Sequence, residues 1–332
     1  MQFGIAGWFR EATLGDPDEF LDMFALADRL GFDAAWLNEF HFERDNHPFP
    51  NTLLLAAAGF VRTERLRIGL SVMVLPIYHP LLLAEALAQL DYQGKGRLDV
   101  GIGRGTTPAS LVALGIDSSE TRARFAEAYA ILLEAWTNES ASYTGRYWKF
   151  ADVGVGPTPV QRPHPPIYVA GMTRDTVLFA VERELPLILA SETERETIAE
   201  YRELAAARGK DVDLSTAVFS RYVCLAATRV EAERLVEQTV ERLNAQKRKT
   251  NPGAAPPYDP ETFRERDCIF GTPDECIIQI HRLHEAWHSD QLRLFFNKAG
   301  TVDRKTERVM MELFATEVLP MCRKLGVAGI PA

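Results

Sequence analysis

The chain has 332 residues, of which 46% are hydrophobic and 25% are charged, and both values are ordinary for a globular protein. This length allows two average domains or one large α/β barrel. The net charge of -9 argues against a nucleic-acid partner, because binding to a phosphate backbone requires a basic surface.

The first residues, 1–6, read as a strand and lack the basic segment and long apolar core of a secretory signal. The apolar run at 53–61 is shorter than the roughly 20 residues that are needed to cross a bilayer. The four cysteines form no CxxC pair, which favours a reduced protein. These features predict a cytoplasmic protein without a membrane span.

Strands and helices are expected to alternate along the chain. Short apolar runs predict strands at 3–6, 34–37, 66–75, 98–102, 167–170, 187–190, 217–226 and 292–296. Apolar residues at helical spacing predict helices at 18–30, 53–61, 81–90, 119–136, 176–183, 194–208, 231–249, 273–287 and 305–319. Pro80 suits the first turn of the third helix, and Gly94 and Gly96 end it.

This alternation predicts one domain, residues 1–332, with the fold of a parallel (β/α)8 barrel (TIM barrel). A doubly wound sheet is the alternative. Residues 138–165 break the rhythm with aromatic residues in short alternating pieces and then several prolines, so an inserted hairpin and loop are expected there. The Pro- and Gly-rich stretch 250–262 is expected to be mobile.

Active sites in such barrels lie at the carboxyl ends of the strands. The candidate positions at those ends are Glu39 and His41, the end of the third strand, Arg104, 170–176 and 190–191.

Each candidate also has a purely structural interpretation. Arg104 lies between two glycines at a strand exit, where a guanidinium suits a phosphate or pairs with a neighbouring helix. The loop 171–176 offers backbone N–H groups and hydroxyls that favour an anion, or it caps the helix that follows. His41 could act as a general base or make only structural hydrogen bonds.

Three histidines, His281, His284 and His288, share one face of a predicted helix with Glu285. Ligands spread over two helical turns seldom converge on one ion, so a solvated face is favoured and no metal is expected.

The combined motifs resemble the bacterial luciferase-like flavin-dependent monooxygenases nearly from end to end. The stretches that carry the resemblance are 36–42, 65–80, 84–91, 96–105, 168–186, 271–276 and 300–303. The resemblance implies a (β/α)8 barrel that binds reduced FMN at the carboxyl ends of its strands and activates O2 as a flavin hydroperoxide.

The resemblance also assigns roles to individual residues. Glu39 matches the acidic residue near the flavin, Leu70-Ser71 the place of a frequent non-prolyl cis peptide bond, and Glu85 a helix glutamate that supports this region. The residues that match contacts to the FMN phosphate and its surroundings are Arg104, Arg122, Thr173 and Thr176, with backbone contacts from Val169, Ala170, Gly171 and Met172. Residues 247–270 fall where luciferase has a mobile lid.

The chain departs from the luciferase pattern at three of these positions. Phe40 stands in place of the first luciferase histidine, and His41, which matches the second, is the catalytic candidate. Gly103 replaces the reactive cysteine, and Met172 replaces an acidic residue. The predicted cofactor site is therefore complete, while the chemistry beside it differs from that of luciferase.

The leading hypothesis is a two-component monooxygenase that takes reduced FMN from a separate flavin reductase, binds that reductase transiently, and uses O2 to oxidise a small organic substrate. One alternative is a deazaflavin-dependent oxidoreductase that transfers hydride without oxygen. Another is a non-catalytic flavin-binding or partner subunit. A homodimer formed through the early helices is expected from the resemblance alone, and the sequence does not identify the organic substrate.

Overall fold

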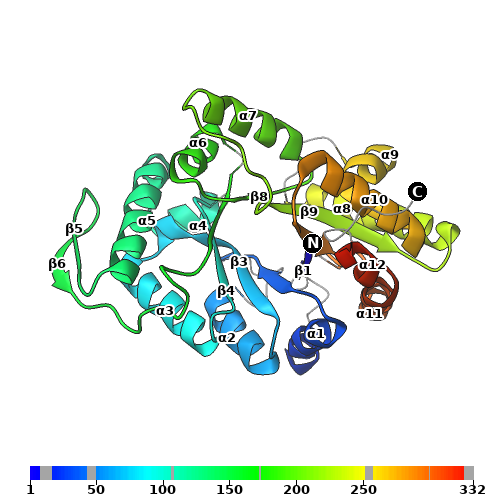
Figure 1. Ribbon diagram of the computed structural model, residues 1–332, viewed down its shortest axis with the longest axis horizontal. Helices are drawn as coiled ribbons and strands as arrows, with labels where there is room; N and C mark the ends of the chain where they lie inside the picture. The colour runs from blue at the N-terminus through cyan, green and yellow to red at the C-terminus, as the bar shows by residue number, and fades with distance from the viewer. Residues whose placement is uncertain are drawn as a thin grey trace. The chain divides into compact units, whose positions relative to one another are not determined.

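Helices and parallel strands alternate along the chain in the computed structural model (Figure 1), which describes residues 1–7, 17–42, 50–105, 108–171, 173–250, 257–298 and 300–324. The chain forms two compact units. The middle unit comprises residues 37–170, and the terminal unit comprises residues 1–36 and 171–332. The order of the elements and their parallel pairing confirm the predicted (β/α)8 barrel.

The middle unit carries three parallel strands, together with helices that precede or follow them in the chain. The strands are β3 (Arg67–Val74), β4 (Leu98–Gly103) and β7 (Ile167–Ala170). The α-helices are α2 (Thr52–Arg62), α3 (Pro80–Gln93), α4 (Pro108–Ala113) and α5 (Thr121–Thr137), with 3-10 turns η2 (Leu75–Ile77) and η3 (Ser118–Glu120). β4 pairs with both β3 and β7 and is buried over its whole length, as expected for a strand that is covered on both faces.

Two helices of the middle unit are joined by a buried indole. Trp136 of α5 is 1% exposed and donates its ring N–H to the backbone oxygen of Ala84 in α3, at 3.1 Å. This bond satisfies the one polar atom of a large apolar side chain. Proline at the start of α3 and glycine at its C-cap delimit the helix as the sequence predicts.

The predicted insertion at 138–165 contains a hairpin beside α5 (Figure 1). Its strands, β5 (Ala141–Thr144) and β6 (Lys149–Val153), pair antiparallel. Glu127 of α5 accepts the backbone N–H groups of Arg146 and Tyr147 in the turn, at 2.8 and 3.1 Å. The carboxylate therefore fixes the hairpin to the helix.

The terminal unit contains the remaining barrel strands and one additional strand. The strands are β1 (Gln2–Ala6), β2 (Ala34–Leu37), whose last residue belongs to the middle unit, β8 (Leu187–Leu189), β9 (Val218–Leu225), β10 (Cys268–Gly271) and β11 (Gln291–Phe295). The helices are α1 (Pro17–Leu30), α6 (Arg174–Arg183), α7 (Glu194–Ala206), α8 (Arg229–Thr250), α9 (Pro260–Thr262), α10 (Pro273–Trp287), α11 (Arg304–Leu313) and α12 (Leu319–Lys324), with π-helical turns η4 (Phe263–Asp267) and η5 (Phe314–Val318).

The strand β10 was not predicted from the sequence, and three of its four residues, 268–270, fall in the predicted lid segment 247–270. One edge of β9 pairs first with β8 through Val218 and Phe219, and then with β10 from Tyr222 onward. Because β8 has only three residues, it leaves the rest of that edge open, and β10 fills it. The lid segment otherwise comprises the end of α8, residues 251–256, which lie outside the described part, and residues 257–267.

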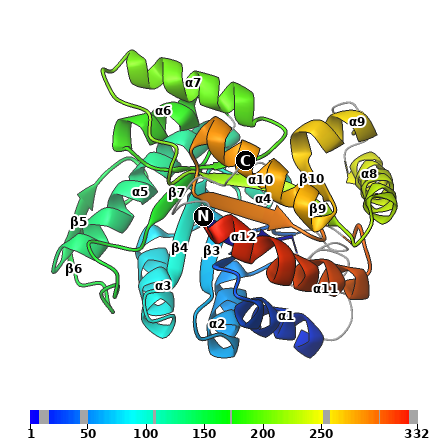
Figure 2. The same ribbon diagram turned by 45° about the vertical axis from the view of Figure 1, so that its right-hand side comes forward.

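An aromatic cluster holds the end of the chain against the strands of the terminal unit. Phe314 of η5 stacks on Phe32 and makes edge contacts with Phe3 and Phe296, at ring separations of 5.5 to 6.0 Å. All four rings are at most 3% exposed. Figure 2 shows α11, which leads into η5, beside α1.

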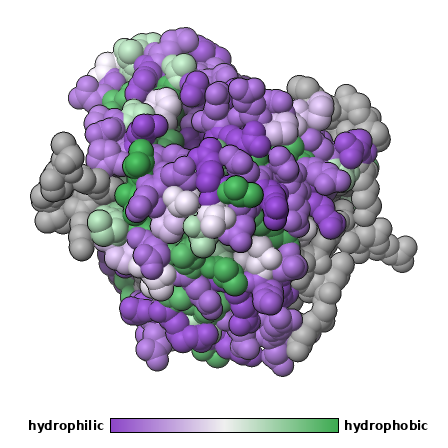
Figure 3. All heavy atoms as spheres, turned by 90° about the vertical axis from the view of Figure 1, so that its right-hand side faces the viewer, coloured by the Kyte–Doolittle hydropathy of each residue, from purple (hydrophilic) through white to green (hydrophobic). Residues whose placement is uncertain are grey.

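The face of the molecule in Figure 3 is mainly hydrophilic, with apolar side chains only in small separate areas. Within the described residues, no helix combines the length and the apolar character that a membrane crossing requires.

Candidate functional site

The carboxylate of Glu39 organises the carboxyl end of β3 in the middle unit. Its side chain is fully buried, and the residue lies two positions after the end of β2. One carboxylate oxygen, Oε2, accepts the backbone N–H of Val74 at 2.7 Å. The other, Oε1, binds Nε2 of His41 at 2.9 Å and also accepts the hydroxyl of Tyr78. The structure thus brings together the predicted Glu39 and His41 and adds a tyrosine that sequence reasoning missed.

This arrangement determines which ring nitrogen of His41 is basic. A carboxylate can only accept hydrogen bonds, so Nε2 carries the hydrogen and Nδ1 holds the lone pair. The hydrogen bond to Glu39, opposed by partial burial and assisted by the charge of Glu39, raises the pKa of His41. Burial, together with the same carboxylate, raises the pKa of Tyr78, so its hydroxyl remains a donor at neutral pH.

A cis peptide bond lies in β3 close to this carboxylate. It joins Ser71 to Val72, one bond after the Leu70-Ser71 pair that the resemblance indicated. Leu70 is fully buried, and the Ser71 hydroxyl donates to the side-chain oxygen of Asn38 at 3.1 Å. The predicted position of the unusual bond is therefore corrected by one residue.

Arg104 leaves β4 between two glycines whose lack of a side chain is required by packing. A Cβ atom on Gly103 would lie 2.5 Å from Val72, and one on Gly105 would lie 2.8 Å from Val74. Gly105 also has a φ of +83°, which side chains disfavour. The ends of β3 and β4 thus fit closely, and they hold the half-buried Arg104 at the strand exit.

Two other predicted residues of the middle unit lie on exposed helix surfaces. Arg122 is exposed in the first turn of α5. Glu85 is exposed on α3, because the buried face of that helix is formed by the stripe of Leu83, Ala84 and Leu87. The supporting role that the resemblance gives Glu85 therefore stays a prediction.

The predicted contacts around the strand-to-helix loop at 169–176 divide between the two units. Val169 and Ala170 belong to β7, with Val169 fully buried. Gly171 follows in the terminal unit, where the hydroxyls of Thr173 and Thr176 lie 3.0 Å apart at the start of α6. Met172 lies outside the described residues.

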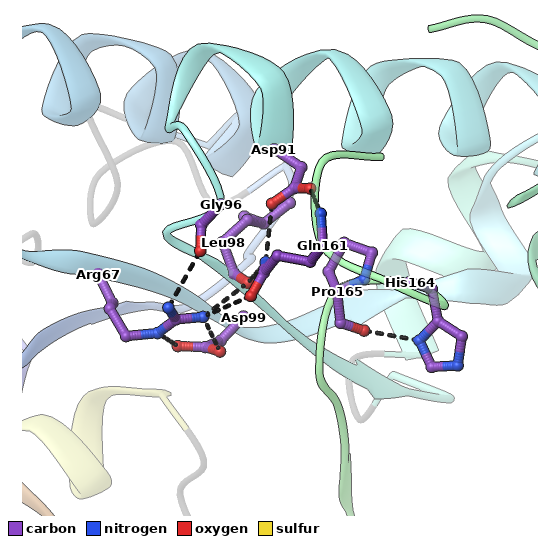
Figure 4. A network of polar contacts seen from close by, with 8 residues as sticks. All are labelled: Arg67, Asp91, Gly96, Leu98, Asp99, Gln161, His164 and Pro165. Atoms are coloured by element: carbon purple, nitrogen blue, oxygen red, sulfur yellow. Dashed lines mark hydrogen bonds and ion pairs between the residues drawn. The ribbon is translucent and has the colours of Figure 1, made fainter. Parts of the chain in front are cut away.

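The opposite, amino-terminal end of β3 and β4 carries a second polar network (Figure 4). Arg67 donates to both carboxylate oxygens of Asp99, at 2.8 and 2.7 Å, and to the backbone oxygen of Gly96. Gln161 accepts from Arg67 and donates through its side-chain and backbone N–H groups to the fully buried Asp91, at 2.7 and 2.9 Å. These groups satisfy one another and connect β3, β4, α3 and the loop before β7.

The terminal unit has a further polar cluster next to the predicted position 190–191, and sequence reasoning missed it. Glu192 follows β8 and accepts the hydroxyl of Tyr258 at 3.0 Å, with the ammonium group of Lys298 4.0 Å away. Desolvation opposes ionisation of Glu192, but Lys298 and these hydrogen bonds outweigh it and lower its pKa. The hydroxyl of Tyr222 is buried beside this cluster, and burial raises the pKa of Tyr222 well above its ordinary value.

The three helix histidines have local partners. His284 bonds the backbone oxygen of Ser289 at 3.0 Å, and His281 lies 3.4 Å from Glu285. His288 caps α10 in a left-handed conformation. Within the described ranges, the structure contains no group of three or more potential metal-ligating residues.

Comparison with known proteins gives matches that span most of the chain. A family model described as luciferase-like monooxygenase matches residues 1–289. The oxygenase component of flavin-dependent trigonelline monooxygenase from Acinetobacter baylyi is 27% identical over 330 residues, which cover 91% of this chain and 89% of that protein.

Two solved structures are also similar over almost their whole length. Monooxygenase RslO1 from Streptomyces bottropensis is 29% identical, with a TM-score of 0.82 and coverage of 96% of this chain and 99% of that chain. The oxygenating constituent of 3,6-diketocamphane monooxygenase from Pseudomonas putida, solved in complex with FMN, is 24% identical, with a TM-score of 0.79 and coverage of 96% and 98%. The second likeness, at this identity, concerns the fold alone.

Proposed function

The chain belongs to the luciferase-like monooxygenase family, and on that premise we propose that it is the oxygenase component of a two-component FMN-dependent monooxygenase. In this proposal a separate flavin reductase supplies reduced FMN during a transient encounter, and the protein uses O2 to oxidise a small organic substrate. The flavin-dependent oxygenase component that matches 91% of the chain supports this assignment. The FMN complex of a protein with the same fold supports the choice of cofactor.

The observation that carries the proposal is the pairing of His41 with a buried, ionisable partner at the carboxyl end of β3. A histidine with one nitrogen fixed on Glu39 and the other basic is suited to accept and return a proton near neutral pH. Carboxyl ends of barrel strands are where such enzymes carry their chemistry.

The residues near this histidine fit a phosphate-bearing cofactor. Arg104 presents a guanidinium at a strand exit where neighbouring glycines keep the backbone approachable. We assign Arg104 and Arg122 to the phosphate of FMN. Val169, Ala170, Gly171, Met172, Thr173 and Thr176 remain predicted contacts from the resemblance, as do Leu70 and Ser71 beneath the ring.

Reduced FMN, when bound, supplies the electrons that activate O2. The chain's own residues hold the cofactor and manage protons. Glu39 orients the imidazole of His41 through Nε2, and His41 exchanges a proton with the substrate side through Nδ1. The amide of Val74 fixes the second oxygen of Glu39, so the carboxylate has one orientation in which to act.

The retained Glu39–His41 pair favours this proposal over a non-catalytic flavin-binding or partner subunit, because a structural subunit does not need an oriented base. A deazaflavin-dependent hydride transfer is the remaining alternative, since Arg104 would suit that phosphate tail equally well.

We keep the cytoplasm as the proposed location and a homodimer as the proposed assembly. The four cysteines are free and buried, which suits a reducing compartment.

An anaerobic titration followed by rapid mixing with oxygen tests the proposed function. The protein is titrated with photoreduced FMN and, separately, with a reduced deazaflavin, and each complex is mixed with air-saturated buffer. We expect micromolar binding of reduced FMN and a return of the oxidised-flavin absorbance that is much slower than for free reduced FMN. Binding of the deazaflavin alone would support the hydride-transfer alternative. Binding of reduced FMN with reoxidation at the free rate would contradict the monooxygenase assignment.

A further inference from the structure

Tyr78 and His41 meet on a single oxygen atom. Tyr78 follows the turn η2 after β3, while His41 follows β2, and both bind Oε1 of Glu39. The other oxygen of that carboxylate is occupied by the amide of Val74 at 2.7 Å. Because the Glu39 side chain is fully buried, no solvent-exposed oxygen is left to compete for these donors.

A shared acceptor couples the two donors. Both donors bind the same negatively charged oxygen, so a hydrogen bond from one donor weakens the hydrogen bond that the oxygen accepts from the other. The hydroxyl of Tyr78 therefore reduces the pull of Glu39 on the imidazolium form of His41. A general base performs best when it can lose its proton near the working pH, and a full carboxylate charge on the same atom would oppose that loss.

We propose that Tyr78 is a positioning residue that acts on His41 through the shared oxygen of Glu39, so that the imidazole can both accept and release a proton near neutral pH. The inference rests on the proposed function for the use of that proton, while its electrostatic content concerns only these three side chains. The family resemblance gives Tyr78 no role, and in the sequence it is simply an aromatic residue that precedes His79 and Pro80.

Glu39 is the charged group that shifts the pKa of His41 in the described part of the chain. Within the described residues, the shifts in the pKa of His41 arise from burial and from Glu39. The hydroxyl of Ser110 in α4 donates to the backbone oxygen of His41 at 3.2 Å, and the ring of Phe42 lies 5.8 Å from the imidazole. Neither of these neighbours carries a charge, so a change at Tyr78 reaches His41 through Glu39.

The test measures the titration of His41 by NMR in protein labelled with 15N-histidine, with the His41→Gln variant used to assign its signal. In Tyr78→Phe, Glu39 loses a competing donor, and we expect the midpoint of the His41 titration to rise by roughly half a pH unit. The acid limb of the plot of turnover against pH should shift to higher pH by the same amount, without a change in reduced-FMN affinity. The matched control is Tyr92→Phe, the same substitution at a tyrosine that is 66% exposed on α3.

A double-variant cycle isolates the route of the effect. In Glu39→Gln the charge is absent, so His41 should titrate lower than in the wild type, and adding Tyr78→Phe should then leave it unchanged. A shift of the same size in the Glu39→Gln background would overturn the proposal, because Tyr78 would then act by another path. An unchanged or lowered midpoint in folded Tyr78→Phe would overturn it as well.

A measurement on the wild type keeps the inference testable if Tyr78→Phe does not fold. The 15N shifts of neutral His41 should show the hydrogen on Nε2, and a hydrogen on Nδ1 would contradict the arrangement. None of these titrations requires flavin or oxygen. They therefore stand or fall separately from the monooxygenase assignment, which the flavin reoxidation experiment tests.

Discussion

The two ends of β3 and β4 use the same kinds of side chain in different ways. At the amino-terminal end, Arg67 and Asp99 bond each other through two nitrogen and two oxygen atoms, and Gln161 links them to Asp91 (Figure 4). At the carboxyl end, Glu39 is just as well bonded, but its partner His41 keeps a basic ring nitrogen.

The difference lies in what each network leaves for a ligand. Burial raises the pKa of Asp99, and this effect is larger than the opposing effect of Arg67. A buried carboxylate is unfavourable without partners, and the polar groups of this network bond one another around it. The carboxyl-end network instead orients a histidine that is 21% exposed. The same strands therefore have a structural end and, in the proposed function, a working end, as barrel enzymes commonly do.

The first prediction tests the structural role of the amino-terminal end with the substitution Arg67→Ala. Removing this guanidinium leaves the carboxylate of Asp99 buried without its partner, which should lower the free energy of unfolding by about 3 kcal/mol or more. Urea denaturation measures the loss, and reduced-FMN affinity of the folded protein should not change. The control is Arg146→Ala in the same unit, whose side chain is 71% exposed and whose loss should cost less than about 1 kcal/mol. If the two substitutions lowered the free energy of unfolding equally, the amino-terminal network would have no special structural role.

The second prediction concerns Gly105 at the working end. Gly105→Ala places a Cβ atom 2.8 Å from Val74 in a left-handed backbone, so the strain and the clash together should cost about 2 to 3 kcal/mol of stability. Gly115→Ala isolates the strain, because Gly115 has a φ of +67° and nothing within 4 Å of the added atom. Thermal unfolding of the two variants should differ by the clash alone. Equal melting temperatures of Gly105→Ala and Gly115→Ala would show that the side chain of Val74 moves aside without a cost in stability.

The third prediction is that Arg104→Ala weakens reduced-FMN binding by about 2 kcal/mol, roughly thirtyfold, because a charge-assisted contact to phosphate is lost. Anaerobic fluorescence titration measures the affinity, with Arg146→Ala again as the exposed control. The stability of Arg104→Ala should remain close to that of the wild type. An unchanged titration would remove Arg104 from the cofactor site.

The smallest expected effect is a pH dependence of stability that belongs to His41. Its pKa is raised in the folded protein, so the folded state holds this proton more tightly than the unfolded chain. The resulting stability is fully present below the ordinary pKa of 6.5 and is lost as the pH rises through the folded-state pKa. The difference in unfolding free energy between the wild type and His41→Gln should therefore be constant below the ordinary pKa of 6.5 and shrink as the pH rises above it. A constant difference would mean that Glu39 does not act on the imidazole.

Most of the fold could be predicted from the sequence, because its signals are local. The predicted helix at 273–287 coincides with α10 (Pro273–Trp287), where the side chains and backbones of Thr272 and Glu275 form a capping box. The short α4 and β10 were missed. β10 has four residues, and it exists because an edge of β9 is open, which no periodicity within 268–271 reveals.

The site could be predicted only in part, for the same reason. Position at a strand exit identified Glu39 and His41, and flanking glycines identified Arg104. Tyr78 meets Glu39 only through the turn after β3, a contact between residues 39 positions apart that no motif encodes. The role that the resemblance gives Glu85 stays a prediction, and the resemblance carried no information about which face of α3 is buried.

Hydrogen exchange of backbone amides, measured with and without reduced FMN under anaerobic conditions, tests directly whether the carboxyl ends of β3 and β4 bind the flavin. The account predicts slower exchange on flavin addition at residues 71–78 and 101–105, with no change at 66–69 and 96–99, where the Arg67–Asp99 network lies. Protection at the amino-terminal end, or no protection in either segment at saturating flavin, would contradict it.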